Sequence, residues 1–193
     1  MSHSAAVPEL WTLGRSRTMS DYADKYITEG HFDLCSMIND DFIVAIKKTW
    51  NEKHYTSCLK LLVSFIDTMA FIDTGDSTSS NFKGWLASYV DLPSVGITAD
   101  ELWEHRNAVL HMTTFDSRKV AAGAVTRLVP YISTSSPPAS DGTFKYYSLH
   151  SLLMAVMNGV GAYVTQMDGN DSMRRRFCGN YEKTISDSHF TIL

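Results

Sequence analysis

Two stretches with apolar residues at helical spacing constrain the fold of this chain more than any other feature. The first runs from Cys58 to Phe71 and is apolar on almost every side, and the second runs from Leu149 to Val164. Apolar residues that recur every three to four positions predict α-helices, and a helix that is apolar all round belongs in the centre of a bundle. We therefore predict that residues from about 56 to 72 and from about 148 to 165 form the two most buried helices.

The second stretch contains two glycines, Gly159 and Gly161, inside its helical pattern. Glycine in a helix interior costs roughly 0.5–1 kcal/mol relative to alanine, so a close contact is the usual reason for its presence. We expect another part of the backbone to approach the helix closely at these glycines.

The whole pattern predicts an all-α bundle of roughly five main helices in a single domain that spans residues 1–193. Further helices are expected at residues 20–28, from Phe32 to about Lys53, from Phe82 to Val90, from Thr98 to about Met112, at Ser117–Ala122 and from Asp171 to about Ile185. β-Branched and aromatic residues at 125–132 and 144–147 indicate the two arms of a small late β-hairpin. Residues 1–18 are expected to be a loose lead-in and residues 186–193 a frayed tail.

Charge and composition narrow the range of functions. The net charge of −4 argues against a generic phosphate-binding surface, so any contact with RNA has to be local. The three cysteines have no Cys-x-x-Cys spacing, which indicates reduced, mostly buried thiols in a cytoplasmic protein. The N-terminus lacks the pattern of a signal peptide, and we expect no membrane-spanning segment because Lys60, Asp67, His150 and Asn158 interrupt the apolar stretches.

The stretch from Thr98 to Met112 carries the most informative polar residues. It begins with a capping box, in which Thr98 can accept a hydrogen bond from the N–H of Glu101 while Glu101 reaches back to the N–H of Thr98. Near its end stands the motif Arg-Asn-x-x-x-His, formed by residues 106–111. This stretch is therefore a helix with three functional groups close to its end.

Helical geometry places these three groups on one half of the helix surface. At about 100° per residue, Asn107 lies about 100° round from Arg106, and His111 lies about 40° beyond Asn107. Trp103 points into the same arc. His105 lies on the side away from His111, and we expect it to be a surface residue.

The motif Arg-Asn-x-x-x-His, late in a helix of an all-α chain, resembles the signature of the HEPN superfamily (higher eukaryotes and prokaryotes nucleotide-binding domains). The resemblance implies a HEPN-like helical bundle and a metal-independent endoribonuclease that cleaves single-stranded RNA. It also implies a homodimer in which Arg106 and His111 of both subunits line one cleft. An antitoxin-like protein is a further partner that such a family suggests.

The chemistry of the three side chains fits this implied activity. His111 can take the proton of a ribose 2′-hydroxyl that attacks the adjacent phosphodiester. The planar fork of Arg106 can stabilise the charge that develops on the phosphate oxygens, and Asn107 can orient the imidazole or a phosphate oxygen. We expect Arg118 and Trp103 to contribute to substrate binding. Neither a metal nor a cofactor is required, because the nucleophile belongs to the substrate.

Two other interpretations remain open at this point. One is a catalytically silent HEPN-like module that binds a nucleotide, RNA or a partner protein. The other is an unrelated helical bundle, in which Arg106 pairs with a carboxylate and His111 is favoured in the last turn by the helix dipole. The acidic net charge favours these two interpretations, and the motif favours the ribonuclease.

Overall fold

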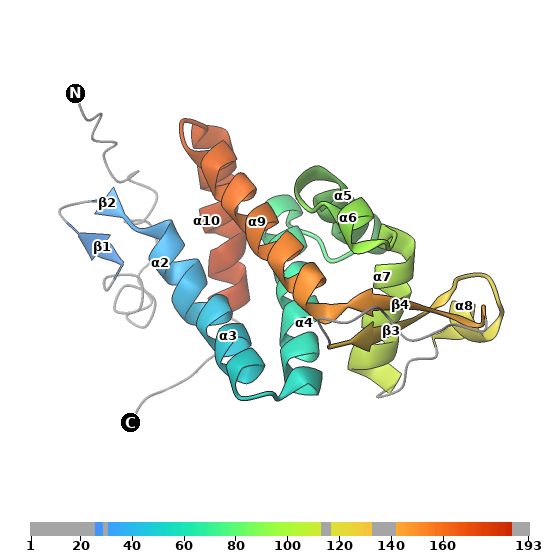
Figure 1. Cartoon of the computed structure of the whole chain (residues 1–193). Coiled ribbons are helices and arrows are strands. Elements are labelled where there is room, and N and C mark those ends of the chain that lie inside the picture. The colour runs from blue at the N-terminus through green and yellow to red at the C-terminus, as the bar shows by residue number, and fades with distance from the viewer. Residues whose placement is uncertain (1–25, 29–30, 113–116, 133–141, 187–193) are drawn as a thin grey trace.

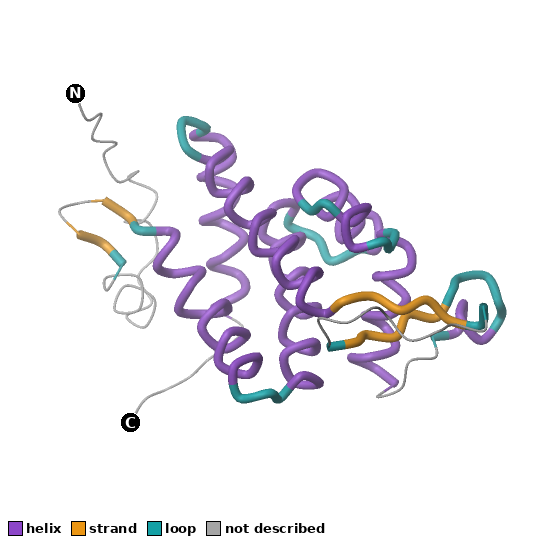
Figure 2. The backbone as a smooth tube through the Cα atoms, viewed as in Figure 1, coloured by secondary structure: helices purple, strands orange, loops and turns teal. Residues whose placement is uncertain are grey.

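The structure, a computed structural model, describes residues 26–28, 31–112, 117–132 and 142–186. These residues form a mainly helical bundle with two small sheets (Figures 1 and 2). The predicted lead-in at 1–18 and the tail beyond residue 186 lie outside the described residues. In chain order the elements are β1 (Ile27–Thr28), β2 (His31–Phe32), α2 (Leu34–Ile38), η2 (Asn39–Ile43), α3 (Val44–Asn51), α4 (Tyr55–Thr74), α5 (Ser79–Tyr89), α6 (Leu92–Val95), α7 (Ala99–Asn107), η3 (Ala108–Met112), α8 (Arg118–Ala121), β3 (Arg127–Tyr131), β4 (Phe144–Ser148), α9 (Leu149–Met167) and α10 (Asp171–Ser186).

Helix α4 lies at the centre of the bundle and packs against α3, α5, α7, α9 and α10 (Figure 1). The prediction that α4 and α9 are the most buried helices is confirmed, since each contributes nine buried residues to the core. Helix α4 ends at Gly75, which adopts a left-handed φ of 84°. A glycine in that conformation closes the last turn without the steric cost that a Cβ would carry.

The two glycines of α9 differ in their surroundings. A Cβ on Gly159 would lie 2.7 Å from the carbonyl oxygen of Tyr89 and 3.0 Å from Cγ2 of Val90, so the end of α5 approaches α9 at this point. A Cβ on Gly161 would meet nothing within 4 Å. The expected close approach is therefore confirmed for Gly159 and wrong for Gly161.

Gly159→Ala is expected to lower the free energy of unfolding by about 1–3 kcal/mol, because a methyl group here forces α9 away from α5. Gly161→Ala is the matched control, and it should raise the free energy of unfolding by about 0.5–1 kcal/mol through helix propensity alone. Urea denaturation of both variants measures the difference. Equal effects of the two substitutions would contradict the close packing at Gly159.

The predicted β-hairpin is wrong, because β3 and β4 pair in parallel, with Arg127 opposite Phe144 and Tyr131 opposite Ser148. A hairpin requires antiparallel strands, whereas parallel strands need a connection of a dozen or more residues. The chain has such a connection in residues 132–143, part of which lies outside the described residues. Composition indicated the strands, but their direction depends on how this connection returns. The small sheet packs against α7 and leads directly into α9.

The N-terminal part of the described chain begins with β1 and β2, an antiparallel pair. A helix was expected at residues 20–28, and β1 shows that this is wrong for Ile27 and Thr28. Residues 20–25 of the expected helix lie outside the described residues. The helix expected from Phe32 to Lys53 is present as α2, η2 and α3, which follow one another without a break from Leu34 to Asn51. All three cysteines are free, and Cys35 is exposed whereas Cys58 is buried.

Helix α4 is long and apolar enough to cross a membrane by length and composition alone, and half of its most apolar window is buried inside the bundle. The core helices of soluble proteins pass the same test. The expectation that no segment spans a membrane therefore stays a prediction.

Candidate functional site

The start of α7 is held in place by the predicted capping box. The Glu101 N–H donates to Thr98 Oγ1 at 3.2 Å, and the Thr98 N–H donates to Glu101 Oε2 at 2.8 Å. Lys145 of β4 forms an ion pair with the same glutamate at 2.7 Å. These contacts tie the beginning of the motif helix to the small sheet, so the orientation of α7 is set before the chain reaches Arg106.

The helix changes from α to π geometry immediately after Asn107, and η3 carries His111. In an α-helix, residues five apart point about 140° away from each other. A π-helix forms its hydrogen bonds between residues five apart, which brings such residues onto neighbouring turns of the same side. The π turn therefore accounts for the contact between Arg106 Nη1 and His111 Nε2, which are 2.9 Å apart. The structure brings together the two residues that define the motif.

Arg106 is held on a further side by Asp67 of α4. The Nε of Arg106 donates to Oδ2 of Asp67 at 2.5 Å, and the Nη2 group pairs with the same oxygen. The side chains of Arg106 and Asp67 are only 15% and 16% exposed. Burial raises the pKa of the Asp67 carboxyl above its usual value, while the hydrogen bond and charge of Arg106 oppose this shift. Because an arginine stays protonated at any working pH, Arg106 is a fixed cation in this pair.

Asn107 and Trp103 complete the immediate surroundings of the guanidinium. Asn107 Oδ1 accepts a hydrogen bond from Arg106 Nη1 at 2.9 Å. The ring of Trp103 lies 5.1 Å from Arg106 Cζ, in cation–π geometry, and its edge meets Phe82 of α5. The guanidinium covers one face of the indole, and the contribution of Trp103 to substrate binding stays a prediction.

The N–H donors of Arg106 determine which nitrogen of His111 accepts a hydrogen bond. Arg106 has only N–H donors, so His111 Nε2 must be the acceptor in their contact. This contact corresponds to the tautomer with the ring proton on Nδ1. His111 itself is exposed, in contrast to the half-buried Arg106. An imidazole acceptor at the solvent edge of a fixed cation is able to take a proton from a hydroxyl group.

The structure does not bring Arg118 to this cluster. Helix α8 begins after Ser117, whose hydroxyl donates to Glu104 Oε2 at 2.7 Å, and Lys119 pairs with the same carboxylate at 3.1 Å. Glu104 precedes Arg106 by two residues, so it lies about 160° round α7 from Arg106. Arg118 thus belongs to a helix anchored on the opposite side of α7, and its contribution to substrate binding stays a prediction.

His105 is not a surface residue, and the expectation of exposure was wrong. Only 2% of His105 is exposed, and its Nε2 lies 3.0 Å from the hydroxyl of Tyr147 on β4. Burial lowers the pKa of His105 to about 4 and raises that of Tyr147. His105 faces the sheet, which the helical pattern of α7 alone does not reveal.

Asp67 is the site residue that sequence reasoning did not assign. In the sequence it is the carboxylate that interrupts the apolar stretch from Cys58 to Phe71. A charged residue inside a core helix is seldom buried without a partner, and this is the signal that points to a cation elsewhere in the chain. The partner, Arg106, is 39 positions away.

Within the described residues, no group of three or more His, Cys, Asp or Glu side chains is placed to hold a metal ion. The cluster around Arg106 offers hydrogen-bond donors for an anion and one acceptor for a proton. Compared with protein-family models, curated proteins and solved structures, the chain matches none of them, so the functional argument rests on the geometry of this cluster.

Proposed function

We propose that this protein is a metal-independent endoribonuclease of the HEPN type that cleaves single-stranded RNA by attack of the ribose 2′-hydroxyl. One observation carries the proposal: the π turn places the exposed imidazole of His111 in direct contact with the half-buried guanidinium of Arg106. A proton acceptor beside a fixed cation matches the two demands of this reaction, which are deprotonation of the hydroxyl and stabilisation of the phosphorane-like transition state.

The contacts of Arg106 indicate how the substrate enters. Four of its five N–H groups are engaged, two by Asp67, one by Asn107 and one by His111. A phosphate oxygen is a stronger acceptor than a neutral imidazole, because charge-assisted hydrogen bonds are roughly twice as strong as neutral ones. The incoming phosphodiester therefore replaces His111 as the acceptor of the Arg106 Nη1 donor. This exchange frees His111 Nε2 for the 2′-hydroxyl.

The reaction then proceeds with all atoms accounted for. His111 Nε2 takes the proton of the 2′-hydroxyl as the 2′-oxygen forms a bond to phosphorus. The bond from phosphorus to the 5′-oxygen breaks, and that oxygen receives a proton from the imidazolium. The products are a 2′,3′-cyclic phosphate and a 5′-hydroxyl. Arg106 stabilises the negative charge on the non-bridging oxygens throughout.

Asp67 and Asn107 act on Arg106 as positioning residues in this scheme. Asp67 engages the Nε edge and the Nη2 group, so the guanidinium plane is set while part of it remains available to the substrate. Asn107 limits the rotation of the Nη1 group. A catalytic cation held in advance by other residues does not have to be ordered when the substrate binds.

We also propose a homodimer, because one face of α4 beside the cluster is left open. Ser57 and Leu61 on this face are exposed, and Leu61 is a large apolar side chain that is 38% exposed. Leu110 of η3 is only partly buried next to α4. A second copy docked on this face would bring two Arg106–His111 pairs to one cleft, as the resemblance to the HEPN superfamily implies.

The second candidate function is a catalytically silent module that binds a nucleotide, RNA or protein. Its support is the engagement of Arg106 by Asp67, Asn107 and His111, which leaves a single N–H for a ligand in this arrangement. In this case His111 only holds the guanidinium of Arg106 in place through their hydrogen bond, and a bound phosphodiester is not cleaved.

Incubation of the purified protein with a labelled single-stranded RNA distinguishes the two candidates. The ribonuclease should produce fragments with 2′,3′-cyclic phosphate and 5′-hydroxyl ends, and excess EDTA should leave the rate unchanged. RNA of the same sequence with 2′-O-methyl groups should bind without being cleaved, because it lacks the nucleophile. Binding of both RNAs with cleavage of neither supports the module, and light scattering that shows a monomer removes the composite cleft.

A further inference from the structure

The face of α4 that carries Asp67 continues toward the beginning of the helix as Ser64 and Lys60. At about 100° per residue, Ser64 lies about 40° and Asp67 about 20° from the direction of Lys60, so the three side chains share one side of α4. Lys60 is partly buried and Ser64 is exposed. A strand of nucleic acid that contacts Asp67's partner, Arg106, can follow this side of the helix.

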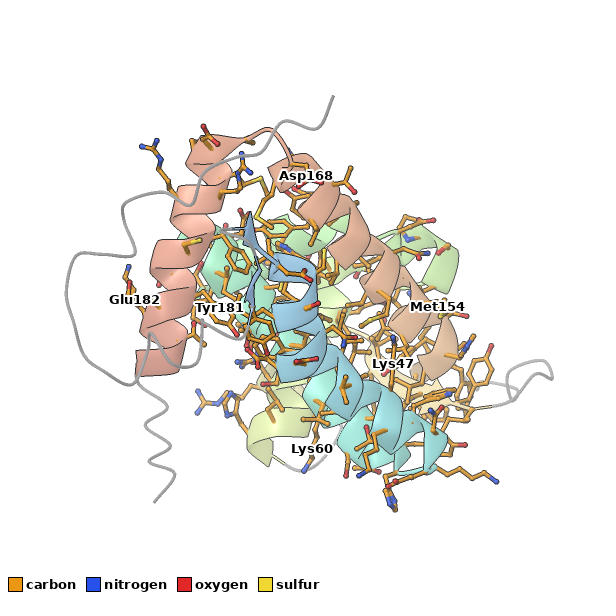
Figure 3. The ribbon with its side chains drawn as sticks, turned by 90° about the vertical axis from the view of Figure 1, so that its left-hand side faces the viewer. Lys47, Lys60, Met154, Asp168, Tyr181 and Glu182 are labelled. Atoms are coloured by element: carbon orange, nitrogen blue, oxygen red, sulfur yellow. The ribbon has the colours of Figure 1, made fainter. Side chains whose placement is uncertain are left out.

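The direction of the neighbouring helix places Lys60 at the level of His111. Helix α4 runs upward in Figure 1, whereas α7 and η3 run downward beside it. Starting from the Asp67–Arg106 contact, Lys60 is about 10 Å along α4 and His111 about 7 Å along the motif helix, in the same direction. Figure 3 shows Lys60 at the lower edge of the molecule, and this is the edge at which η3 ends in Figure 1.

Lys60 has no acidic partner in the part of the chain that the structure describes. The positions three and four residues away on α4 are Thr56, Ser57, Val63 and Ser64, so no carboxylate is within reach on its own helix. Lys60 is thus a partly buried lysine without an acidic partner among the described residues. In a protein with a net charge of −4, such a cation beside the candidate site is a specific feature and not part of a general basic surface.

We infer that Lys60 binds a second phosphate of the substrate, next to the one that Arg106 and His111 hold. This inference rests on the proposed function and specifies its substrate as a polynucleotide with at least two phosphodiesters, not a mononucleotide. The scissile phosphate lies between Arg106 and His111, and the chain continues along α4 past His111 to Lys60. Phosphate contacts of this kind set the register of the strand and do not read its sequence.

The test compares Lys60→Gln with Lys47→Gln, a control of the same charge change at an exposed lysine on α3 (Figure 3). The binding probe is a fluorescently labelled 2′-O-methyl RNA oligonucleotide, titrated at several salt concentrations. Loss of one phosphate contact should weaken binding about fivefold at about 0.1 M salt and reduce the slope of log K against log salt by about 0.7. Lys47→Gln should change neither quantity, and Lys60→Arg should retain both.

Cleavage of a dinucleoside monophosphate, which contains one phosphodiester, completes the test. Its kcat/KM should be the same for Lys60→Gln and the wild type, because the second phosphate is missing. An equal loss on the dinucleoside and the oligonucleotide would place Lys60 at the scissile phosphate and overturn the inference. Unchanged oligonucleotide binding by Lys60→Gln would overturn it too, while the ribonuclease proposal stands. A wild type that neither binds nor cleaves RNA would remove both.

Discussion

His111→Ala is expected to lower the rate of RNA cleavage by about 10²–10⁴-fold, the usual cost of a lost general base. The fold should remain nearly unchanged, since the side chain is exposed and its recorded contact is with Arg106. A histidine near a helix C-terminus contributes at most about 2 kcal/mol through the helix dipole. Single-turnover cleavage kinetics and thermal unfolding of the same preparation measure the two effects separately.

Arg106→Lys is the companion variant. It keeps the positive charge beside Asp67 but loses the planar fork that reaches Asp67, Asn107 and the phosphate at once. We expect cleavage to fall by at least about 10²-fold, as for the loss of one donor to a developing oxyanion, with little loss of stability. Arg106→Ala is a less informative change, because it leaves the half-buried Asp67 carboxylate without its partner. If activity and stability fall in proportion in both His111→Ala and Arg106→Lys, the cluster is structural.

His105 is expected to make the stability of the protein depend on pH. Burial lowers the pKa of His105 to about 4, so in the range between about 4 and 6.5 the unfolded chain binds the proton and the folded protein does not. The stability that His105 contributes is complete above about pH 6.5 and is lost as the pH falls through about 4. Relative to His105→Gln, the wild type should lose up to about 3 kcal/mol of unfolding free energy between neutral pH and pH 4.

Asp41 is expected to change the stability with pH in the direction opposite to His105. It lies in η2, accepts a hydrogen bond from Tyr181 of α10, and burial raises its pKa to about 6. The folded protein therefore binds the proton between about pH 4 and 6, and the stability due to the neutral carboxyl is lost as the pH rises through about 6. Relative to Asp41→Asn, the wild type should become less stable with rising pH. Urea denaturation across this pH range measures the stability of the wild type relative to each variant. If both differences changed with pH in the same direction, the pKa shift of His105 or that of Asp41 would be contradicted.

The local sequence pattern was sufficient to predict the helices that form the core and the residue at which the motif helix begins. The apolar stripes of α4 and α9 predicted the two most buried helices, because a wide apolar surface can be removed from water only at the centre of a bundle. The capping box between Thr98 and Glu101 is a contact between residues three apart, so the order of residues alone defines it.

The contacts that complete the candidate site depend on the tertiary structure. Asp67 reaches Arg106 across 39 positions, and the π turn that brings His111 to Arg106 departs from the regular helix on which sequence reasoning relies. The burial of His105 depends on a sheet whose strands turned out parallel, and their direction is set by a connection and not by composition. Periodicity describes one helix at a time. The partner of each polar side chain is decided when several elements pack together. Only then are charged groups that are far apart in the chain removed from water at the same place, where they have to pair with each other.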